Sequence, residues 1–401
     1  MRASFQKVLP VLFSRFYRFA DVAAAAAAAS CLCLLALHHT TALAQTPPAP
    51  VINAKAWMLL DLSSGQVLAS QNPAERIEPA SLTKLMTAYL VFSALKAKTV
   101  TLEQAVPVSS KAWKMGGSRM FIEPLRPVTV AELLRGMIVQ SGIDASVALA
   151  ELIAGSEQAF AAAMNREAKR LSMKNTNFRN ATGWPDPEHF TTAADLAVLA
   201  GAIIRDFPDF YALYAIKDYA YNNITQVNRN KLLWIDPNVD GMKTGHTESA
   251  GYCLISSARR GPRRLLSVVL GATSENARAT ESQKLLNFGF LNYDGVKLYE
   301  KGQSIASLEV WKGSAREVKA GFDRELFVTL PKGQADKVKA TLLSQKPLLA
   351  PIAAGQRIGT MKVTVEGRDI AEVAVVALEA IEGAGVFGRA YDTVRLWFAK
   401  S

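Results

Sequence analysis

The sequence predicts an α+β protein made of two domains and a C-terminal helix. Between residues 79 and 290, apolar positions recur mostly at helical spacing, with strand-like segments before and within this region. After about Tyr293 the helical spacing fades, and short β-rich runs separated by glycines follow. Residues 386–401 return to an amphipathic helical pattern. At 401 residues, the chain is long enough for two domains with their own cores.

The first 44 residues have the pattern of a secretory signal peptide. A basic segment, residues 1–21, precedes an apolar run from Val22 to Leu37, and the small residues Ala42 and Ala44 offer a cleavage site. The run is shorter than the ~20 residues that a membrane-spanning helix needs. We therefore expect cleavage after Ala44 rather than an uncleaved anchor. A lipid-modified Cys31 is a weaker alternative, because the branched residue expected before such a cysteine is missing.

Cleavage leaves a basic chain with one thiol. Lys plus Arg falls from 46 to 42 and Asp plus Glu from 35 to 34, so the formal net charge becomes +8. Cys31 and Cys33 leave with the signal, and Cys253 alone cannot form an internal disulfide. The basic residues are scattered and lack the interleaved aromatics of RNA-binding surfaces. We expect an anionic membrane surface or cell-wall polymer as partner, and no nucleic acid.

The first domain should combine a hairpin, a helical region and a return to strands. Residues 57–69 read as two strands around a turn at residues 63–65. A helix is expected from Pro79 to Lys96, because proline is tolerated at a helix start. A loop rich in glycine and proline covers residues 180–187. The remaining helices are expected at 130–139, 145–153, 157–171, 192–204 and 274–290, and the strands at 252–258 and 265–270.

The second domain should be small and rich in β-strands, and a helix should follow it. The predicted strands are residues 305–311, 325–330, 358–365 and 370–378. In the final helix, apolar and aromatic residues such as Phe387, Tyr391 and Trp397 share one face, while the charged residues lie elsewhere. This pattern is typical of a helix in a membrane interface, which we favour over a helix docked on its own domain.

The first chemical signal is the motif SLTK at residues 81–84. Positions i and i+3 share a helix face, so the Lys84 amine can reach the Ser81 hydroxyl. A serine hydroxyl needs an adjacent base to become a nucleophile, and a lysine with a lowered pKa can be that base. Alone, this pattern is weak and fits an ordinary helix surface.

Two further motifs follow in the chain. Ser141-Gly142 lies between two expected helices, where a second serine can relay a proton to a leaving group. The motif KTGH at residues 243–246 offers an ammonium, a hydroxyl and an unhindered backbone for a C-terminal carboxylate and an extended peptide. Its alternative is a surface turn. Ser141 follows Ser81 by 60 residues and Lys243 follows Ser141 by 102, and this ordered set is far more specific than any part of it.

The chain resembles the D-alanyl-D-alanine carboxypeptidases among the low-molecular-mass penicillin-binding proteins. The resemblance rests on PASLTKLMT at 79–87, DGMKTGHT at 240–247 and AGY at 250–252. Residues 285–289, the β-rich domain and the amphipathic end are also similar, so the resemblance covers nearly all of the mature chain. It implies a β-lactamase/transpeptidase-like domain, in which an antiparallel sheet is flanked by helices and an all-helical lobe.

The resemblance also implies a two-step acyl transfer and gives each motif a role. Ser81 would attack the penultimate D-alanine carbonyl of a peptidoglycan stem peptide while Lys84 accepts its proton, with Ser141 as the relay. The backbone N–H groups of Ser81 and His246 would form the oxyanion hole. Residues 243–245 (Lys243, Thr244, Gly245) would bind the substrate and hold its carboxylate. β-Lactams would acylate Ser81 stably, and no cofactor or metal is implied.

One position departs from the family pattern. The second motif of the family is usually S-x-N, and this chain has Ile143 in place of the asparagine. Isoleucine cannot hydrogen-bond, so we expect reduced or substrate-restricted carboxypeptidase activity, which Ile143→Asn should raise. The neighbouring Asp144 would face about 100° away on a helix and does not replace the asparagine. Arg229, before the third motif, either adds positive charge for the substrate carboxylate or is an ordinary surface arginine.

Several alternatives remain open at this point. A β-lactamase uses the same motifs, but the E-x-x-L-N segment of its deacylating glutamate is missing between Ser141 and Lys243. A D,D-endopeptidase and a non-catalytic cell-wall-binding protein are the others. A zinc peptidase is disfavoured, because His189 and His246 are the only histidines of the mature chain and form no H-E-x-x-H motif.

These observations give a complete domain scheme. We expect a signal peptide at 1–44, a peptidase domain at 45–293, a β-rich domain at 294–385 and a membrane-binding helix at 386–401. The expected location is the periplasmic face of the inner membrane, with peripheral attachment.

Overall fold

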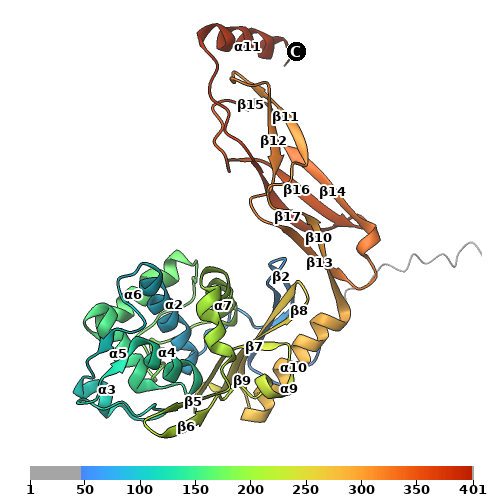
Figure 1. Cartoon of the computed structure of the whole chain (residues 1–401). Helices are drawn as coiled ribbons and strands as arrows, with labels where there is room; N and C mark the ends of the chain where they lie inside the picture. The colour runs from blue at the N-terminus through green and yellow to red at the C-terminus, as the bar shows by residue number, and fades with distance from the viewer. Residues whose placement is uncertain (1–46, 400–401) are drawn as a thin grey trace, which may run out of the picture. The chain divides into compact units, whose positions relative to one another are not determined.

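The structure is a computed structural model that describes residues 47–399 (Figure 1). The predicted signal peptide and Lys400 lie outside the described residues. Within them, a five-stranded antiparallel sheet with the order β2-β1-β9-β8-β7 is the centre of the first domain. Its strands are β1 (Ala56–Asp61), β2 (Gln66–Gln71), β7 (Val239–Thr247), β8 (Gly251–Arg260) and β9 (Arg263–Ala272).

The sheet is covered on both faces because its side chains alternate. In β1, Trp57 and Leu59 pack into a cluster with Leu285 and Leu286 of helix α10 (Glu275–Asn292). Met58, between them, packs into the larger cluster on the opposite face. This period of two is the normal consequence of strand geometry. The sheet is therefore buried except at its edges, and β7 is one of those edges.

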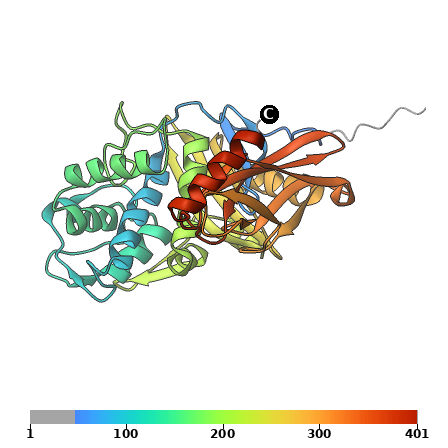
Figure 2. The same ribbon diagram turned by 90° about the horizontal axis from the view of Figure 1, so that it is seen from above.

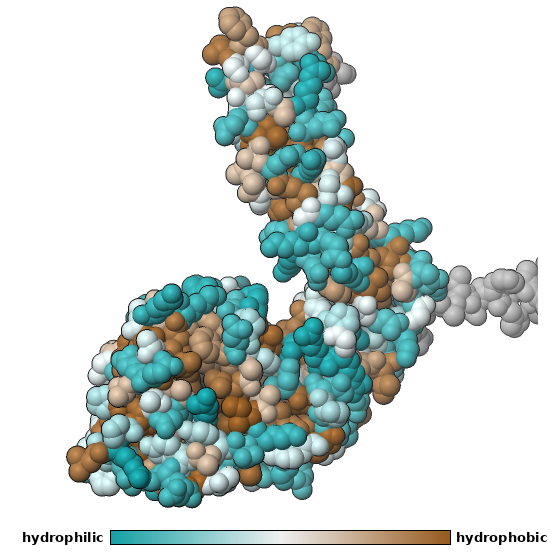
Figure 3. Space-filling view, in the orientation of Figure 1, coloured by the Kyte–Doolittle hydropathy of each residue, from teal (hydrophilic) through white to brown (hydrophobic). Residues whose placement is uncertain are grey.

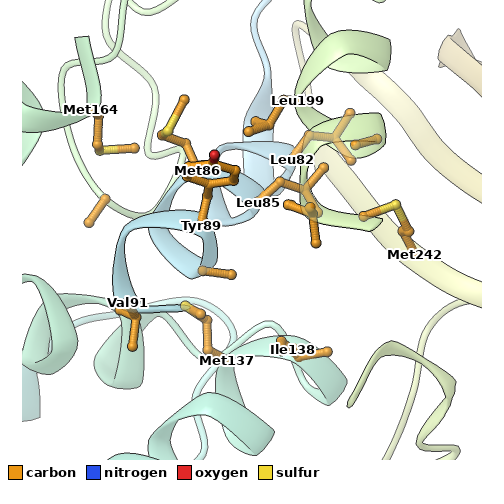
Figure 4. Close-up of a cluster of buried hydrophobic side chains, with 14 of the residues drawn as sticks. Leu82, Leu85, Met86, Tyr89, Val91, Met137, Ile138, Met164, Leu199 and Met242 are labelled. Atoms are coloured by element: carbon orange, nitrogen blue, oxygen red, sulfur yellow. The ribbon is translucent and has the colours of Figure 1, made fainter. Parts of the chain in front are cut away.

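The larger cluster joins the sheet to a helical lobe. The helices coloured blue to green in Figure 2 are gathered apart from the yellow strands of the sheet. Figure 4 shows Leu82, Leu85 and Met86 in the middle of this core, and each is completely buried. The helices of this domain are α2 (Lys84–Lys96), α3 (Ser110–Lys114), α4 (Val130–Val139), α5 (Ile143–Ala154), α6 (Glu157–Arg170), α7 (Ala193–Asp206), α8 (Pro208–Tyr211) and α9 (Leu232–Ile235).

Side-chain caps explain where several of these helices begin. Thr129 and Glu132 form a reciprocal capping box at the start of α4, with the Thr129 N–H donating to Glu132 Oε2 at 2.8 Å. Ser156, Thr192 and Ser274 accept from the backbone at the starts of α6, α7 and α10. Short pairs β3 (Ala105–Val106) with β4 (Val128–Thr129) and β5 (Asp218–Tyr221) with β6 (Ile224–Val227) complete the domain.

The β-rich region after Tyr293 has its own hydrophobic core. A six-stranded sheet has the order β14-β16-β17-β12-β11-β15, and β10 pairs with β13. Val318, Phe322, Val328 and Val363 are among its buried residues. The strands are β10 (Tyr293–Tyr299), β11 (Ala306–Trp311), β12 (Glu317–Gly321), β13 (Leu326–Pro331), β14 (Val338–Ser344), β15 (Leu348–Leu349), β16 (Arg357–Val365) and β17 (Arg368–Ala377).

The C-terminal helix α11 (Val386–Ala399) contacts this region through polar residues. Asp392 accepts from the Lys312 backbone N–H at 2.6 Å, and the Arg395 guanidinium lies 5.0 Å from the centre of the Trp311 ring. The apolar stripe stays exposed, as the brown residues over α11 in Figure 3 show. The exposed apolar side chains on this helix are Val386, Phe387, Tyr391, Val394, Trp397 and Phe398.

The predicted fold class is confirmed, but several short elements of the first domain, such as α3, α8, α9 and β3 to β6, were not predicted. The stretch expected as one helix from Pro79 is a 3₁₀ turn, η1 (Ala80–Thr83), followed by α2. After Tyr293, strands β10, β12, β14 and the two-residue β15 were not predicted, because half-exposed strands with charged residues, and very short strands, lack a clear apolar alternation.

No single helix within residues 47–399 is long and apolar enough to cross a bilayer. Helices α5 and α6 together meet the length and composition criteria, with a bend of 81° between them. Val147, Leu149 and Phe160 of this pair are buried in the domain core, which accounts for their apolar composition.

Candidate active site

The turn that carries Ser81 is fixed by close backbone packing. Ala80 has a φ of 48°, so the chain is in the left-handed region just before the serine. A Cβ on Gly183 would lie only 1.7 Å from the Ala80 carbonyl oxygen, and Gly183 itself has a φ of 83°. Only glycine fits there. The loop at residues 180–187 therefore holds the serine turn from one side.

Ser81 and Lys84 are joined across the 3₁₀ turn. The Lys84 Nζ lies 2.8 Å from Ser81 Oγ and also donates to the Thr182 carbonyl oxygen at 2.6 Å. Residues i and i+3 eclipse each other in a 3₁₀ turn, so the predicted proximity holds although the helix starts later than expected. Lys84 is 2% exposed.

The burial of Lys84 changes its chemistry. Desolvation and, to a smaller extent, the positive charge of Arg229 lower the pKa of Lys84 to about 7, although the negative charge of Asp144 acts in the opposite direction. An amine with this pKa is largely neutral at pH 8, where it can accept a proton. The geometry therefore places a base within hydrogen-bond distance of a serine hydroxyl.

Ser141 lies at the bend between α4 and α5. Its φ is 67°, it is 3% exposed, and its hydroxyl oxygen has no hydrogen-bond partner within the described residues. It lines the same cleft as Ser81. A buried hydroxyl without a partner is uncommon and costs free energy, which is typical of a side chain that meets a substrate.

The residues after Ser141 hold a neighbouring loop. The Ile143 backbone N–H donates to the Ser118 carbonyl oxygen at 2.7 Å. The Asp144 carboxylate accepts from the backbone N–H groups of Met120 and Phe121 at 3.0 and 2.8 Å. Asp144 thus points into the loop that it caps, and the expectation that it does not take the asparagine's place agrees with the structure.

The third motif lies on the edge strand β7. Lys243 and Thr244 are 3% and 5% exposed. A Cβ on Gly245 would lie 3.3 Å from the Ala80 side chain and from the Pro79 carbonyl oxygen, so the glycine lets β7 approach the serine turn closely. The His246 ring stacks on Tyr252 with ring centres 4.0 Å apart.

A group of cations surrounds these residues. Burial lowers the pKa of Lys243 well below its usual value, and the charges of Lys84, Arg229 and Arg278 act in the same direction. Arg278, on α10, is 3% exposed and donates to the Gly245 carbonyl oxygen at 3.3 Å. Such a concentration of positive charge favours an anionic ligand.

All three motifs meet at one cleft with a volume of about 460 Å³. Ser81, Ser141, Thr244, Gly245 and His246 line it, and Lys84 and Lys243 are buried beside it. Arg229, for which a substrate-binding role and a surface role were both open, also lines the cleft.

Sequence reasoning missed four parts of the site. The Thr182 carbonyl, Trp184, Arg278 and the segment at 117–118 also belong to it. The loop at 180–187 was recognised only as a loop, because its composition does not indicate what it contacts. Arg278 carries no local signal at all, since only the packing of α10 on the sheet brings it to the cleft.

The histidine that does not line the cleft supports the serine turn. His189 is 2% exposed, and its Nε2 lies 3.0 Å from the Thr83 hydroxyl oxygen. Burial lowers the pKa of His189 to about 4, so the ring is neutral at physiological pH. Residues 47–399 contain no group of three His, Cys, Asp or Glu side chains arranged to hold a metal ion.

Comparison with known proteins gives the family. Residues 42–274 match the family model described as D-alanyl-D-alanine carboxypeptidase, and residues 293–383 match that of the penicillin-binding protein 5 C-terminal domain. The chain is 43% identical to D-alanyl-D-alanine carboxypeptidase DacC of Escherichia coli over 91% of this chain and 94% of that protein. It is 42% identical to DacA of Haemophilus influenzae over 86% and 89%.

Solved structures agree with this result. Penicillin-binding protein 5 of Haemophilus influenzae has a TM-score of 0.80 at 42% identity, covering 84% of this chain and 99% of that one. Penicillin-binding protein D2 of Listeria monocytogenes, solved with ampicillin bound, has a TM-score of 0.56 at 29% identity and covers 61% and 99%. These relatives favour a carboxypeptidase over the alternative enzymes and over a binding protein. The chain belongs to the D-alanyl-D-alanine carboxypeptidase family of penicillin-binding proteins.

Proposed function

We propose that the chain is a serine-type D-Ala-D-Ala carboxypeptidase in which Ser81 is the nucleophile and Lys84 its base. The observation that carries the proposal is the 2.8 Å separation of Lys84 Nζ and Ser81 Oγ, together with a lysine pKa of about 7. A neutral lysine next to a serine hydroxyl is the minimum that nucleophilic acyl transfer requires. The substrate is the D-Ala-D-Ala end of a peptidoglycan stem peptide.

The first step forms the acyl-enzyme. Ser81 Oγ attacks the carbonyl carbon of the penultimate D-alanine, and its proton passes to Lys84. The backbone N–H groups of Ser81 and His246 stabilise the oxyanion. The proton then moves to the nitrogen of the terminal D-alanine, which leaves as the C–N bond breaks. Ser141 is the relay for that transfer, and its unpartnered buried hydroxyl supports this role.

The second step is hydrolysis of the ester on Ser81 by water. Before that, during the first step, Lys243 and Thr244 hold the carboxylate of the terminal D-alanine, and the charges of Arg229 and Arg278 assist them. The open edge of β7 offers backbone groups to an extended peptide, with Gly245 leaving room for it. A β-lactam imitates the D-Ala-D-Ala end, and its acyl-enzyme on Ser81 is long-lived.

The domain scheme belongs to the same proposal. Residues 1–44 direct export and are removed, 45–293 form the peptidase domain, and 294–385 form the β-rich domain. The helix at 386–401 binds the periplasmic face of the inner membrane. Its six exposed apolar side chains, with polar residues turned toward the β-rich domain, support this location.

A fluorescent penicillin tests the enzymatic proposal. The wild-type chain should retain the label for minutes, and Ser81→Ala should take up none. A soluble stem pentapeptide should release D-alanine in the same preparations. Rapid release of the penicillin product would indicate a β-lactamase, and cleavage of cross-linked dimers without D-alanine release would indicate an endopeptidase. An unlabelled wild-type protein would contradict the proposal.

Vesicle binding tests the location. The mature chain should sediment with vesicles that contain anionic lipid, and a variant that ends at Gly385 should remain in the supernatant while keeping its penicillin label. Equal sedimentation of both proteins would contradict the role of the helix.

A further inference from the structure

The cleft has an apolar part in addition to its cations. Gly117, Ile143 and Trp184 line it and converge on one point. A Cβ placed on Gly117 would lie 2.9 Å from Ile143 Cδ1 and 3.5 Å from an atom of the Trp184 ring. Gly117 has a φ of 75°, so glycine is the residue that this position accepts. The three residues therefore form one continuous surface, which we call the apolar wall.

Two members of the apolar wall, Trp184 and Ile143, are held in place by backbone hydrogen bonds. Asn180 Oδ1 accepts from the backbone N–H of Trp184 at 3.1 Å, and the Trp184 carbonyl oxygen accepts from Asn180 Nδ2 at 2.9 Å. Ile143 is anchored through the 2.7 Å bond from its N–H to Ser118. The Trp184 side chain nevertheless remains 48% exposed. A large aromatic ring with a fixed backbone and a free face is suited to contact a ligand.

The elements that carry the wall indicate which part of a ligand meets it. In the proposed function, Lys243 and Thr244 of β7 hold the carboxylate on the leaving side of the scissile bond. Ile143 begins α5, and Gly117 and Trp184 lie in loops that line the same cleft, so the wall does not belong to the carboxylate-binding strand. We therefore assign the wall to the acyl side, where the Ile143 side chain can make apolar contacts but no hydrogen bond.

We propose that the apolar wall of Gly117, Ile143 and Trp184 selects ligands that carry an aliphatic or aromatic group on the acyl side of the scissile bond. The inference rests on the proposed function, because it assumes that Ser81 is acylated in this cleft. For a stem peptide, this group is the side chain of the residue before the two D-alanines. For a β-lactam, it is the acyl substituent on the ring.

Two penicillins that differ only in this group test the inference. Benzylpenicillin and 6-acetamidopenicillanic acid share the nucleus and the amide, and only the first carries a phenyl ring. The measured quantity is the ratio of their second-order acylation rate constants, obtained by competition with a fluorescent penicillin. Because both constants come from one preparation, the ratio does not depend on the fraction of active protein.

The expected ratio depends on Trp184. Trp184→Ala should lower it about tenfold, and Trp184→Phe should keep most of it, because an aromatic contact contributes roughly a tenfold preference. Trp234 is the matched control, since it is also 48% exposed and does not line the cleft. Trp234→Ala should leave the ratio unchanged.

Ile143→Asn tests the other half of the inference. It should raise the rate constant for the acetamido compound about fivefold, because an asparagine side chain can hydrogen-bond to the amide of the ligand and an isoleucine cannot. The benzylpenicillin constant should rise less, so the ratio falls. A ratio that Trp184→Ala and Ile143→Asn leave unchanged overturns the inference. If neither penicillin acylates Ser81 in the wild-type chain, the proposed function itself fails.

Discussion

The peptidase domain and the β-rich domain differ in whether charged side chains are buried. In the first, Lys84, Lys243 and Arg278 are 2%, 3% and 3% exposed, and burial together with the charges of Lys84, Arg229 and Arg278 lowers the pKa of Lys243. Among the described residues after Tyr293, no Lys, Arg, Asp or Glu is buried, and the buried polar side chains there are Thr329 and Gln334. Both regions nevertheless have compact cores of aliphatic and aromatic residues.

Burying several like charges is costly, because each loses its hydration and repels the others. The peptidase domain carries this cost at its cleft, where the same features lower the pKa of a base and attract an anion. The β-rich domain has no such group of buried charges among its described residues, and its buried Thr329 donates a hydrogen bond to the Asp61 carboxylate of β1 at 2.9 Å. The comparison predicts that substitutions in the two regions affect different measurements.

The largest expected effect comes from Lys84→Ala. Removing the base should lower the acylation rate constant for a fluorescent penicillin about a thousandfold, the size typical of general-base catalysis. The control is Lys96→Ala in the same helix, which removes an exposed lysine outside the cleft. If Lys84→Ala were acylated within tenfold of the wild-type rate, Lys84 would not be the base, and the buried charges of the cleft would not account for its reactivity.

A core substitution in the β-rich domain should lower stability and leave acylation unchanged. Phe322 is 2% exposed and stacks on Tyr299 with ring centres 5.4 Å apart. Phe322→Ala should lower the free energy of unfolding of this domain by about 3–5 kcal/mol, from lost burial and the cavity left behind. Chemical denaturation followed by circular dichroism measures this loss, and the acylation rate constant should stay within twofold of wild type.

If Phe322→Ala also slowed acylation strongly at a temperature where it is folded, the two regions would not be independent. A Tyr299→Phe variant, which removes only a hydroxyl, controls for unspecific effects of the substitutions and should be close to neutral in both measurements.

The sequence predicted much of this arrangement. The order and spacing of the three motifs predict one site, and in the structure Ser81, Ser141 and Thr244 line one cleft, with Lys243 buried beside it. Helix α4 has the predicted bounds, because its capping residues and apolar spacing agree. The separate β-rich region was visible from the loss of helical spacing after Tyr293.

Other features were outside the reach of sequence patterns. The 3₁₀ turn at Ser81 was predicted as helix, because the two conformations share the same apolar spacing over four residues. Arg278 and Trp184 reach the cleft through tertiary packing, and neither has a local signal. A C-terminal helix docked on its own domain was the alternative considered, but the contact through Asp392 was not predicted, since a lone acidic residue on a helix does not indicate its partner.

The pH dependence of acylation tests whether Arg229 affects the pKa of Lys84 within the cleft. Lys84 accepts a proton only when neutral, so the rate constant should rise with pH through about 7 and level off above it. The positive charge of Arg229 lowers the lysine pKa, so Arg229→Gln should raise that pKa and move the rising limb to higher pH. Stopped-flow acylation between pH 5 and 9 measures both profiles.

The control for the pH profile is Arg76→Gln. Arg76 is exposed, and its guanidinium lies 4.4 Å from the centre of the Phe190 ring rather than in the cleft. Arg76→Gln should leave the rise of the acylation rate constant at the same pH as in the wild type. If Arg229→Gln leaves the rising part of the rate–pH profile where it is, or moves it to lower pH, the titrating group is not Lys84.

The smallest expected effect concerns α11, and it tests whether the β-rich domain holds this helix. The Asp392 carboxylate accepts from the Lys312 N–H at 2.6 Å, and losing such a bond costs about 1 kcal/mol. Asp392→Ala should therefore speed amide hydrogen exchange in residues 386–399 about fivefold, with acylation and vesicle binding unchanged. Thr393→Ala, which removes an exposed hydroxyl bonded within the helix, is the control. Equal exchange in both variants would mean that the hydrogen bond of Asp392 does not hold the helix on the β-rich domain.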